Sequence, residues 1–336
     1  MIDVLLSVGV GMSLLFAFTN GMKDGSNVLA TAVSSGSLSF RTARWLVVLS
    51  ELAGPFLLGI PVALTVVHGI VRVELFPHDA DALLMVLCGV SGALIWNVSC
   101  WLLRLPTSSS FALIGGLVGP ALYRFGLAGV PWAVFLVKVL GALILSPVLG
   151  ILFGGFAYKL LVWALRDAPW KTVRTLKRVQ VASLIVLGAN HGTNDSQKTM
   201  GLIVLLLFLA GRGDAASVPF WVMAASVACL AVGITMGGTG IIRTVGYNIF
   251  RVRPEHSFSS QVSAALILLF CNLIGAPVSS TQIISSSVIG VGNACRSRGV
   301  RWQVTLSIFV GWAVTVPLAG ILSTLLYLGL HALLVA

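Results

Sequence analysis

Residues 19–35 read TNGMKDGSNVLATAVSS and interrupt an apolar run that begins at Val4. The stretch places Lys23, Asp24 and Asn27 where hydrocarbon is expected. A charged side chain at the centre of a bilayer costs about 2.5–3.5 kcal/mol on insertion scales. Charges at such a position therefore indicate a functional site, and the alternative is an ion pair that only holds helices together.

The composition is that of a protein that crosses the membrane many times. The chain has 336 residues, of which 57% are hydrophobic and 9% are charged. Soluble domains carry about 25% charged residues. Apolar stretches of roughly 20 residues recur along the whole length, so no room remains for a soluble domain. The net charge of +11 follows from basic residues in cytoplasmic loops, so we expect the lipid bilayer, and no nucleic acid, as a partner.

One constant offset shows that the chain contains two copies of a single pattern. The residue pairs separated by 171 positions are Gly21 with Gly192, Asp24 with Asp195, Pro106 with Pro277, Ser108 with Ser279, Ser109 with Ser280, Ser110 with Thr281, and Gly119 with Gly290. A single gapless offset that joins two separate motifs indicates internal duplication. We expect an N-terminal repeat at 1–165, a basic cytoplasmic linker at 166–178 and a C-terminal repeat at 179–336.

Each copy contains five apolar segments, so the second copy enters the membrane from the opposite side. The fold class expected is all-α and polytopic, with two inverted-topology repeats, broken helices and re-entrant-type hairpins at the midplane. The breaks are expected at NGMKDGSN (20–27), PTSSS (106–110), HGTNDSQK (191–198) and PVSST (277–281).

Loop charges set the orientation. Counted from an outside N-terminus, the inside loops hold Arg41, Arg44, Arg166, Lys171, Arg174, Lys177, Arg178, Arg243, Arg251, Arg253, Arg296, Arg298 and Arg301. The outside loops hold only Arg72, Arg124 and Arg212. By the positive-inside rule both termini lie outside. The expected location is the plasma membrane, which is the inner membrane in a bacterium.

The Ser/Thr runs and the carboxylates suit two different ions. If each run opens the following helix, its hydroxyls and free backbone N–H groups form a site for an oxyanion. Serines also pack between transmembrane helices without binding anything, but the recurrence of the run at the common offset favours a site. Asp24, Asn27, Asn194 and Asp195 supply oxygen ligands for Na⁺, or a carboxylate that carries a proton. A bound cation would let an anion approach the carboxylates, which is the physical basis of symport.

These motifs resemble the inorganic phosphate transporter (PiT) family over nearly the whole chain. The family signature G-A-N-D-x-x-N-A is similar to NGMKDGSNVLATAVSSGSLS and to GANHGTNDSQKTMGLI. The family hairpin motif P-[VT]-S-[ST]-[ST]-H is similar to PTSSSFALIGGLVG and GAPVSSTQIISSSVIGVG. The resemblance implies a symporter, and no enzyme, that carries inorganic phosphate with Na⁺ or H⁺ and needs no other cofactor.

The resemblance also implies roles for individual residues. The hairpin hydroxyls would bind phosphate together with Asn27; they belong to Ser108, Ser109, Ser110, Ser279, Ser280 and Thr281. The cation-coupling set would be Asp24, Asn27, Glu51, Asn194 and Asp195, with Asp24 and Asp195 as Na⁺ ligands if sodium is the coupling ion. Lys23 and Lys198 would modulate the charge of the site.

Four positions depart from the family pattern. Lys23 replaces the usual Asn or His, Phe111 and Gln282 replace the histidines after the hairpin motifs, and Gln261 replaces a glutamate. These changes leave the coupling ion open. Two alternatives also remain: a carrier of another oxyanion such as sulfate, and a channel-like or non-transporting relative. The oligomeric state, a homodimer included, is not set by the sequence.

Overall fold

The computed structural model describes residues 1–77, 79–103, 107–168 and 172–334, and every regular element within them is a helix. Pro106 of the first hairpin motif and residues 169–171 of the expected linker lie outside the described residues. The elements are α1 (Ile2–Ser34), α2 (Phe40–Leu58), α3 (Pro61–Gly69), η1 (Val73–Leu75), α4 (Ala80–Leu102), α5 (Ser109–Phe125), η2 (Gly126–Gly129), α6 (Trp132–Val134), η3 (Phe135–Gly141), α7 (Ala142–Ala164), α8 (Thr172–Leu209), α9 (Phe220–Met236), α10 (Thr239–Arg243), η4 (Thr244–Ile249), α11 (Pro254–Leu273), α12 (Ser280–Arg296), η5 (Ser297–Gly299) and α13 (Trp302–Leu334).

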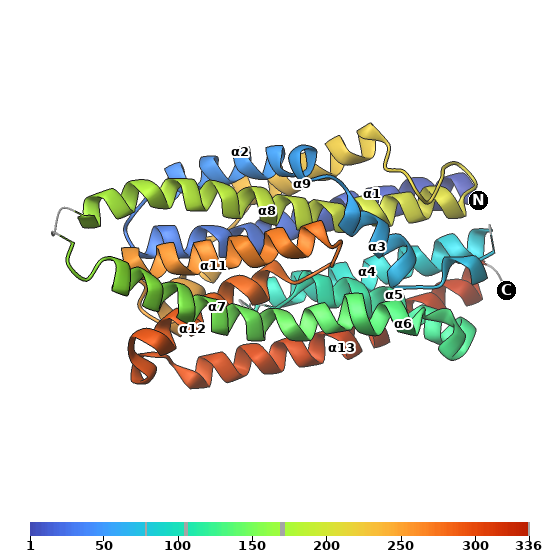
Figure 1. The fold of residues 1–336 in the computed structure, drawn as a ribbon. Helices are drawn as coiled ribbons and strands as arrows, with labels where there is room; N and C mark the ends of the chain where they lie inside the picture. The colour runs from blue at the N-terminus through green and yellow to red at the C-terminus, as the bar shows by residue number, and fades with distance from the viewer. Residues whose placement is uncertain (78, 104–106, 169–171, 335–336) are drawn as a thin grey trace.

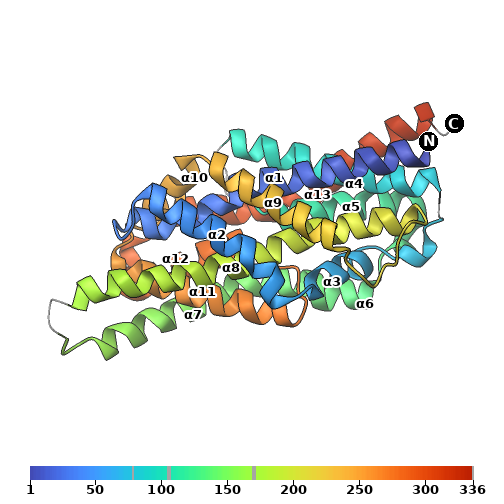
Figure 2. The same ribbon diagram turned by 90° about the horizontal axis from the view of Figure 1, so that it is seen from above.

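The long helices form one elongated bundle. Within the described residues, six helices are long and apolar enough to cross a membrane, and the number rises to eight if two bent helix pairs are each counted as one span. The expected multi-pass membrane protein is thereby confirmed. Both views place the N- and C-terminal ends of the chain at the same end of the bundle (Figures 1 and 2).

The two signature stretches do not break their helices, so the predicted breaks at 20–27 and 191–198 are wrong. α1 and α8 are continuous through these stretches. The glycines serve close packing instead, because a Cβ at Gly21 would collide with the Leu230 carbonyl of α9, and one at Gly192 would collide with the Glu51 backbone of α2. The polar side chains find partners on neighbouring helices, so the backbone keeps its own hydrogen bonds.

The bends lie instead in the helices that cross the signature helices. α2 and α3 meet at 75°, and α9 meets the segment Gly240–Ile249 at 71°. At the first bend, the Gln197 amide donates to the Gly59 carbonyl over 2.7 Å and accepts from the Val62 and Ala63 amides over 2.8 and 3.1 Å. At the second, Ser26 Oγ donates to the Gly238 carbonyl over 3.2 Å. Irregular backbone is therefore satisfied by side chains from α8 and α1, as membrane depth requires.

The contacts of Gln197 give a first prediction. Gln197→Leu keeps the side-chain volume but leaves the buried Val62 amide without a partner, at a cost of about 1–3 kcal/mol, and removes one of the two acceptors of the Ala63 amide, which also donates to Ile60. We expect the melting temperature of the purified protein in detergent to fall by several degrees. Gln303→Leu, at an exposed position of α13, is the matched control. Equal melting temperatures for the two variants would contradict the bridging role of Gln197.

Two helical hairpins approach the middle of the bundle from opposite ends. α4 and α5 lie toward the end that holds the chain termini, whereas α11 and α12 lie toward the other end (Figure 1). The helices also exchange partners: α5 packs against α13, and α12 packs against α7. The last helix of each half thus covers the hairpin of the other half.

Candidate functional site

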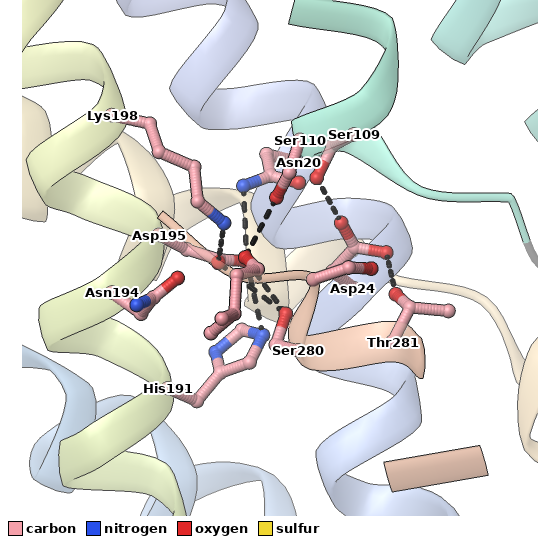
Figure 3. A network of polar contacts seen from close by, with 12 residues as sticks. Asn20, Asp24, Ser109, Ser110, His191, Asn194, Asp195, Lys198, Ser280 and Thr281 are labelled. Atoms are coloured by element: carbon pink, nitrogen blue, oxygen red, sulfur yellow. Dashed lines mark hydrogen bonds and ion pairs between the residues drawn. The ribbon is translucent and has the colours of Figure 1, made fainter. Parts of the chain in front are cut away.

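Asp24 of α1 is the point at which the two hairpins meet. Ser109 Oγ, from the first turn of α5, donates to Asp24 Oδ2 over 2.6 Å. Thr281 Oγ1, from the first turn of α12, donates to Asp24 Oδ1 over 2.6 Å (Figure 3). Asn27 Nδ2 in turn donates to Thr281 Oγ1 over 2.9 Å. The Asp24 carboxylate thus accepts only from hydroxyls and an amide among the described residues. No Lys, Arg or His of the described residues lies within ion-pair distance of it.

Asp195 of α8 has a different set of partners. Lys198 Nζ lies 2.5 Å from Asp195 Oδ1, and Asn20 donates to Asp195 Oδ2 over 3.1 Å. Ser280 Oγ lies 3.2 Å and His191 Nε2 lies 3.2 Å from Oδ2 (Figure 3). Ser109 and Ser280 thus make the same contact with the equivalent aspartates, but only the second aspartate has cationic neighbours.

His191 joins Asp195 to the predicted site residue Glu51. Its Nδ1 lies 2.8 Å from Glu51 Oε1, and all three side chains are fully buried. The ring therefore has a carboxylate on each side, although neither of its nitrogens makes a hydrogen bond of good geometry. Because α8 is continuous here, His191 lies inside the helix and does not cap its end.

The structure separates Lys23 and Asn194 from this cluster. Lys23 Nζ donates to Asn97 Oδ1 of α4 over 3.2 Å, and within the described residues no carboxylate lies in ion-pair distance of it. Asn194 Nδ2 donates to Asn272 Oδ1 of α11 over 2.8 Å. The two residues are equivalent by the 171-residue offset, and each contacts the first helix of a hairpin.

The serines at the helix starts have two roles. Ser108 and Ser279 are N-caps, whose hydroxyls accept from the amides three residues later over 3.2 and 3.3 Å. Ser110 Oγ donates to the Val278 carbonyl over 2.9 Å, so the hairpins touch directly. The first N–H groups of α5 and α12 have no acceptor within their own helix and carry the positive ends of the helix dipoles.

The site is closed to solvent. No side chain among Asp24, Asn27, Ser109, Ser280 and Thr281 is more than 2% exposed. A cavity of about 780 Å³ is lined by other residues, among them Val33, Trp101 and Arg243. A second cavity of about 80 Å³ is lined by Trp101 and by Asn97, the acceptor of Lys23. Trp101 therefore stands between the larger cavity and the Lys23 side of the site.

Several buried amide oxygens lack a hydrogen-bond partner. They are Oδ1 of Asn20, Asn27 and Asn194. Asn20 and Asn27 flank Asp24 at i−4 and i+3, on the same face of α1. Oxygen atoms without donors beside a carboxylate fit the ligand preference of a hard cation such as Na⁺.

Three of the four departures from the family pattern, Phe111, Gln261 and Gln282, are neutral side chains. Gln261 accepts from Ser183 over 2.7 Å and donates to Thr31 over 3.1 Å, which links α11 to α8 and α1. Gln282 accepts from Ser146 over 3.2 Å. Phe111 is buried in the core.

The sequence reasoning missed Asn20, Asn97 and Gln197 as contributors to the site. A signal existed for two of them. Asn20 lies one helical turn before Asp24, and Gln197 is equivalent to Ser26 by the common offset. Asn97 lies in an apolar segment with no motif around it, so only the folded structure connects it to Lys23.

A model of the phosphate transporter family matches residues 20–174 and 165–323. The chain belongs to this family. It is 37% identical over 326 residues to a probable low-affinity inorganic phosphate transporter of Mycobacterium tuberculosis, covering 96% of this chain and 77% of the relative. A Bacillus subtilis protein of the same name is 33% identical, covering 97% and 98%. The solved structure of a sodium-dependent phosphate transporter has a TM-score of 0.89 and 22% identity, covering 98% of this chain and 100% of that one, which shows a shared fold.

Proposed function

We propose that this chain is a secondary active transporter, and no enzyme, that carries inorganic phosphate across the membrane in symport with Na⁺ or H⁺. The observation that carries the proposal is the meeting of two helix starts, with Ser109 and Thr281, at the buried carboxylate of Asp24. Helix N-termini with hydroxyls on either side suit a tetrahedral oxyanion. The names of the relatives support phosphate as that oxyanion.

In this structure the hydroxyls that phosphate would need donate their hydrogen bonds to the carboxylates of Asp24 and Asp195. In the proposed cycle a coupling cation binds the carboxylate of Asp24, with Asn20 and Asn27 as further ligands. The hydroxyls of Ser109 and Thr281 then turn from Asp24 to the anion. The two ions thereby favour each other's binding, since coupling between sites is reciprocal.

An architecture of two inverted repeats, 1–165 and 179–336 with a linker at 166–178, is part of the proposal. Hairpins at opposite ends and the exchanged packing of α5 and α12 support it. α8 begins at Thr172, so much of the linker range is helical. The proposed location is the plasma membrane with both termini outside, and the basic loops support this orientation.

The proposed activity is tested with the purified protein in proteoliposomes. Radiolabelled phosphate should be taken up along Na⁺ or pH gradients varied independently, and should exchange against phosphate trapped inside. Exchange distinguishes a carrier from a channel. Sulfate replaces phosphate in a parallel assay, and preference for sulfate would refute the assignment of the substrate.

The hydroxyl contacts give a second prediction. Ser109→Ala and Ser280→Ala each remove a donor at a helix start, and hydrogen bonds to charged groups contribute about 1.5–3 kcal/mol. We expect phosphate affinity to fall about 10-fold or more in each variant. Ser217→Ala, at an exposed position outside the bundle core, is the control. Equal affinities for all three variants would exclude a shared anion site.

A further inference from the structure

The two signature helices carry one lysine each, at different places in the motif. The first copy reads KDGSN at 23–27 and the second reads NDSQK at 194–198. By the 171-residue offset, Lys198 stands where the first copy has Asn27. The second copy therefore has an ammonium where the first has an amide, which adds a positive charge beside Asp195 but not beside Asp24.

The contacts of Asp195 leave no place for a metal ion. Four groups approach its two oxygens: the Lys198 ammonium at 2.5 Å, the Asn20 amide at 3.1 Å, the Ser280 hydroxyl and the His191 ring. A carboxylate has about four lone-pair positions, and the hydrogen bonds from Lys198, from Asn20 and from Ser280, which reaches both oxygens, fill them. The Lys198 side chain is 1% exposed and lies on the same face of α8 as Asp195 (Figure 3).

The surroundings of Asp24 differ from those of Asp195 in charge. Its partners Ser109, Thr281 and Asn27 are neutral donors. Asn20 and Asn27, which share its face of α1 at i−4 and i+3, have buried Oδ1 atoms without donors. A buried carboxylate without a cation is costly, so this is the place where a mobile cation is needed.

We propose that the Lys198 ammonium is a built-in substitute for one coupling cation, so that a mobile cation binds beside Asp24 and not beside Asp195. This inference deepens the proposed function and rests on it for the meaning of the cation. The ammonium neutralises Asp195 through the whole transport cycle, because it is covalently attached to α8. Lys198 then sets the number of ions that the cycle moves.

The test is the variant Lys198→Asn, which restores at this position the amide that the first copy has at Asn27. Its Asp195 carboxylate loses the tethered charge and gains a carbonyl oxygen, so Na⁺ should bind there. We expect the melting temperature in detergent to rise more on replacing choline by Na⁺, at equal ionic strength, in the variant than in the parent protein. Phosphate uptake by the variant should rise about 10-fold on the same replacement, because a buried unpaired charge is relieved.

Lys159→Asn is the matched control, since Lys159 is exposed on α7. It should respond to Na⁺ as the parent protein does. If Lys198→Asn also responds as the parent does, or cannot be recovered from membranes prepared in Na⁺, the proposal is overturned. If the asparagine variant is insoluble, Lys198→Gln, which also offers an amide oxygen, is compared with the parent protein in the same way. A Na⁺ response of Lys198→Gln equal to that of the parent would also overturn the proposal.

The measurement separates this inference from the proposed function. The Na⁺-dependent melting temperature requires no transport. A parent protein that does not exchange phosphate would refute the transport function, while the comparison of Na⁺ responses would still decide the role of Lys198. Transport with equal Na⁺ responses would refute the role of Lys198 alone.

Discussion

Asp24→Asn should reduce phosphate uptake into proteoliposomes about 100-fold or more. The amide keeps the shape of the side chain but removes the negative charge that holds the coupling cation, and a loss of about 3 kcal/mol corresponds to this factor. The variant also replaces one of the two carboxylate oxygens by an NH₂ group, so one of the two hydroxyls, that of Ser109 or that of Thr281, loses its acceptor.

Two controls show whether the loss of uptake comes from the site itself and not from misfolding or from the loss of any acidic side chain. Asp3→Asn, at an exposed position near the start of the same helix, should transport at the parent rate. Size-exclusion chromatography should show that the Asp24 variant remains folded. Uptake by Asp24→Asn within a few-fold of the parent rate would show that Asp24 is not a coupling residue.

The second large effect concerns stability. Asp195→Asn should destabilise the protein by about 3–5 kcal/mol, because it leaves the buried Lys198 ammonium without its carboxylate. The double variant Asp195→Asn/Lys198→Met removes both charges and should recover most of this loss, since replacing a whole buried pair by uncharged groups is often neutral. Urea unfolding in detergent, or the melting temperature, provides the measurement.

The control for this prediction is a surface ion pair. Arg166 and Asp167 form one with the two side chains 68% and 85% exposed, and such pairs contribute about 0–1 kcal/mol. Asp167→Asn should therefore leave stability nearly unchanged. A double variant at Asp195 and Lys198 that is no more stable than the single variant would show that the loss does not come from the unpaired ammonium.

The sequence predicted which residues would lie together because duplication gave two independent views of one motif. The offset that pairs Ser109 with Ser280 and Asp24 with Asp195 also describes their contacts, since each serine donates to its own aspartate. The helix breaks could not be read in the same way. Glycine lowers helix propensity, but at Gly21 its small size serves the approach of α9, and the two effects have the same sequence signal.

The two lysines show a further limit. Lys23 is adjacent to Asp24 in sequence, which suggested an ion pair, but residues i and i+1 of a continuous helix do not face each other. Lys198 and Asp195 are three residues apart and share a helix face. The correct pairing follows once the helix is known to be continuous, and the sequence pattern favoured a break at that place.

The exchanged partners of α5 and α13 have a consequence for the synthesis of the chain. Gly115 and Gly119 of α5 lie against the backbone of α13 at Val316 and Gly320, so closely that a Cβ at either glycine would collide with it. The ribosome makes α13 after every other described helix, and this face of α5 is uncovered until α13 is inserted. The packing of the first hairpin is therefore complete only when α13 has joined the bundle, so the first half of the chain does not assemble fully by itself.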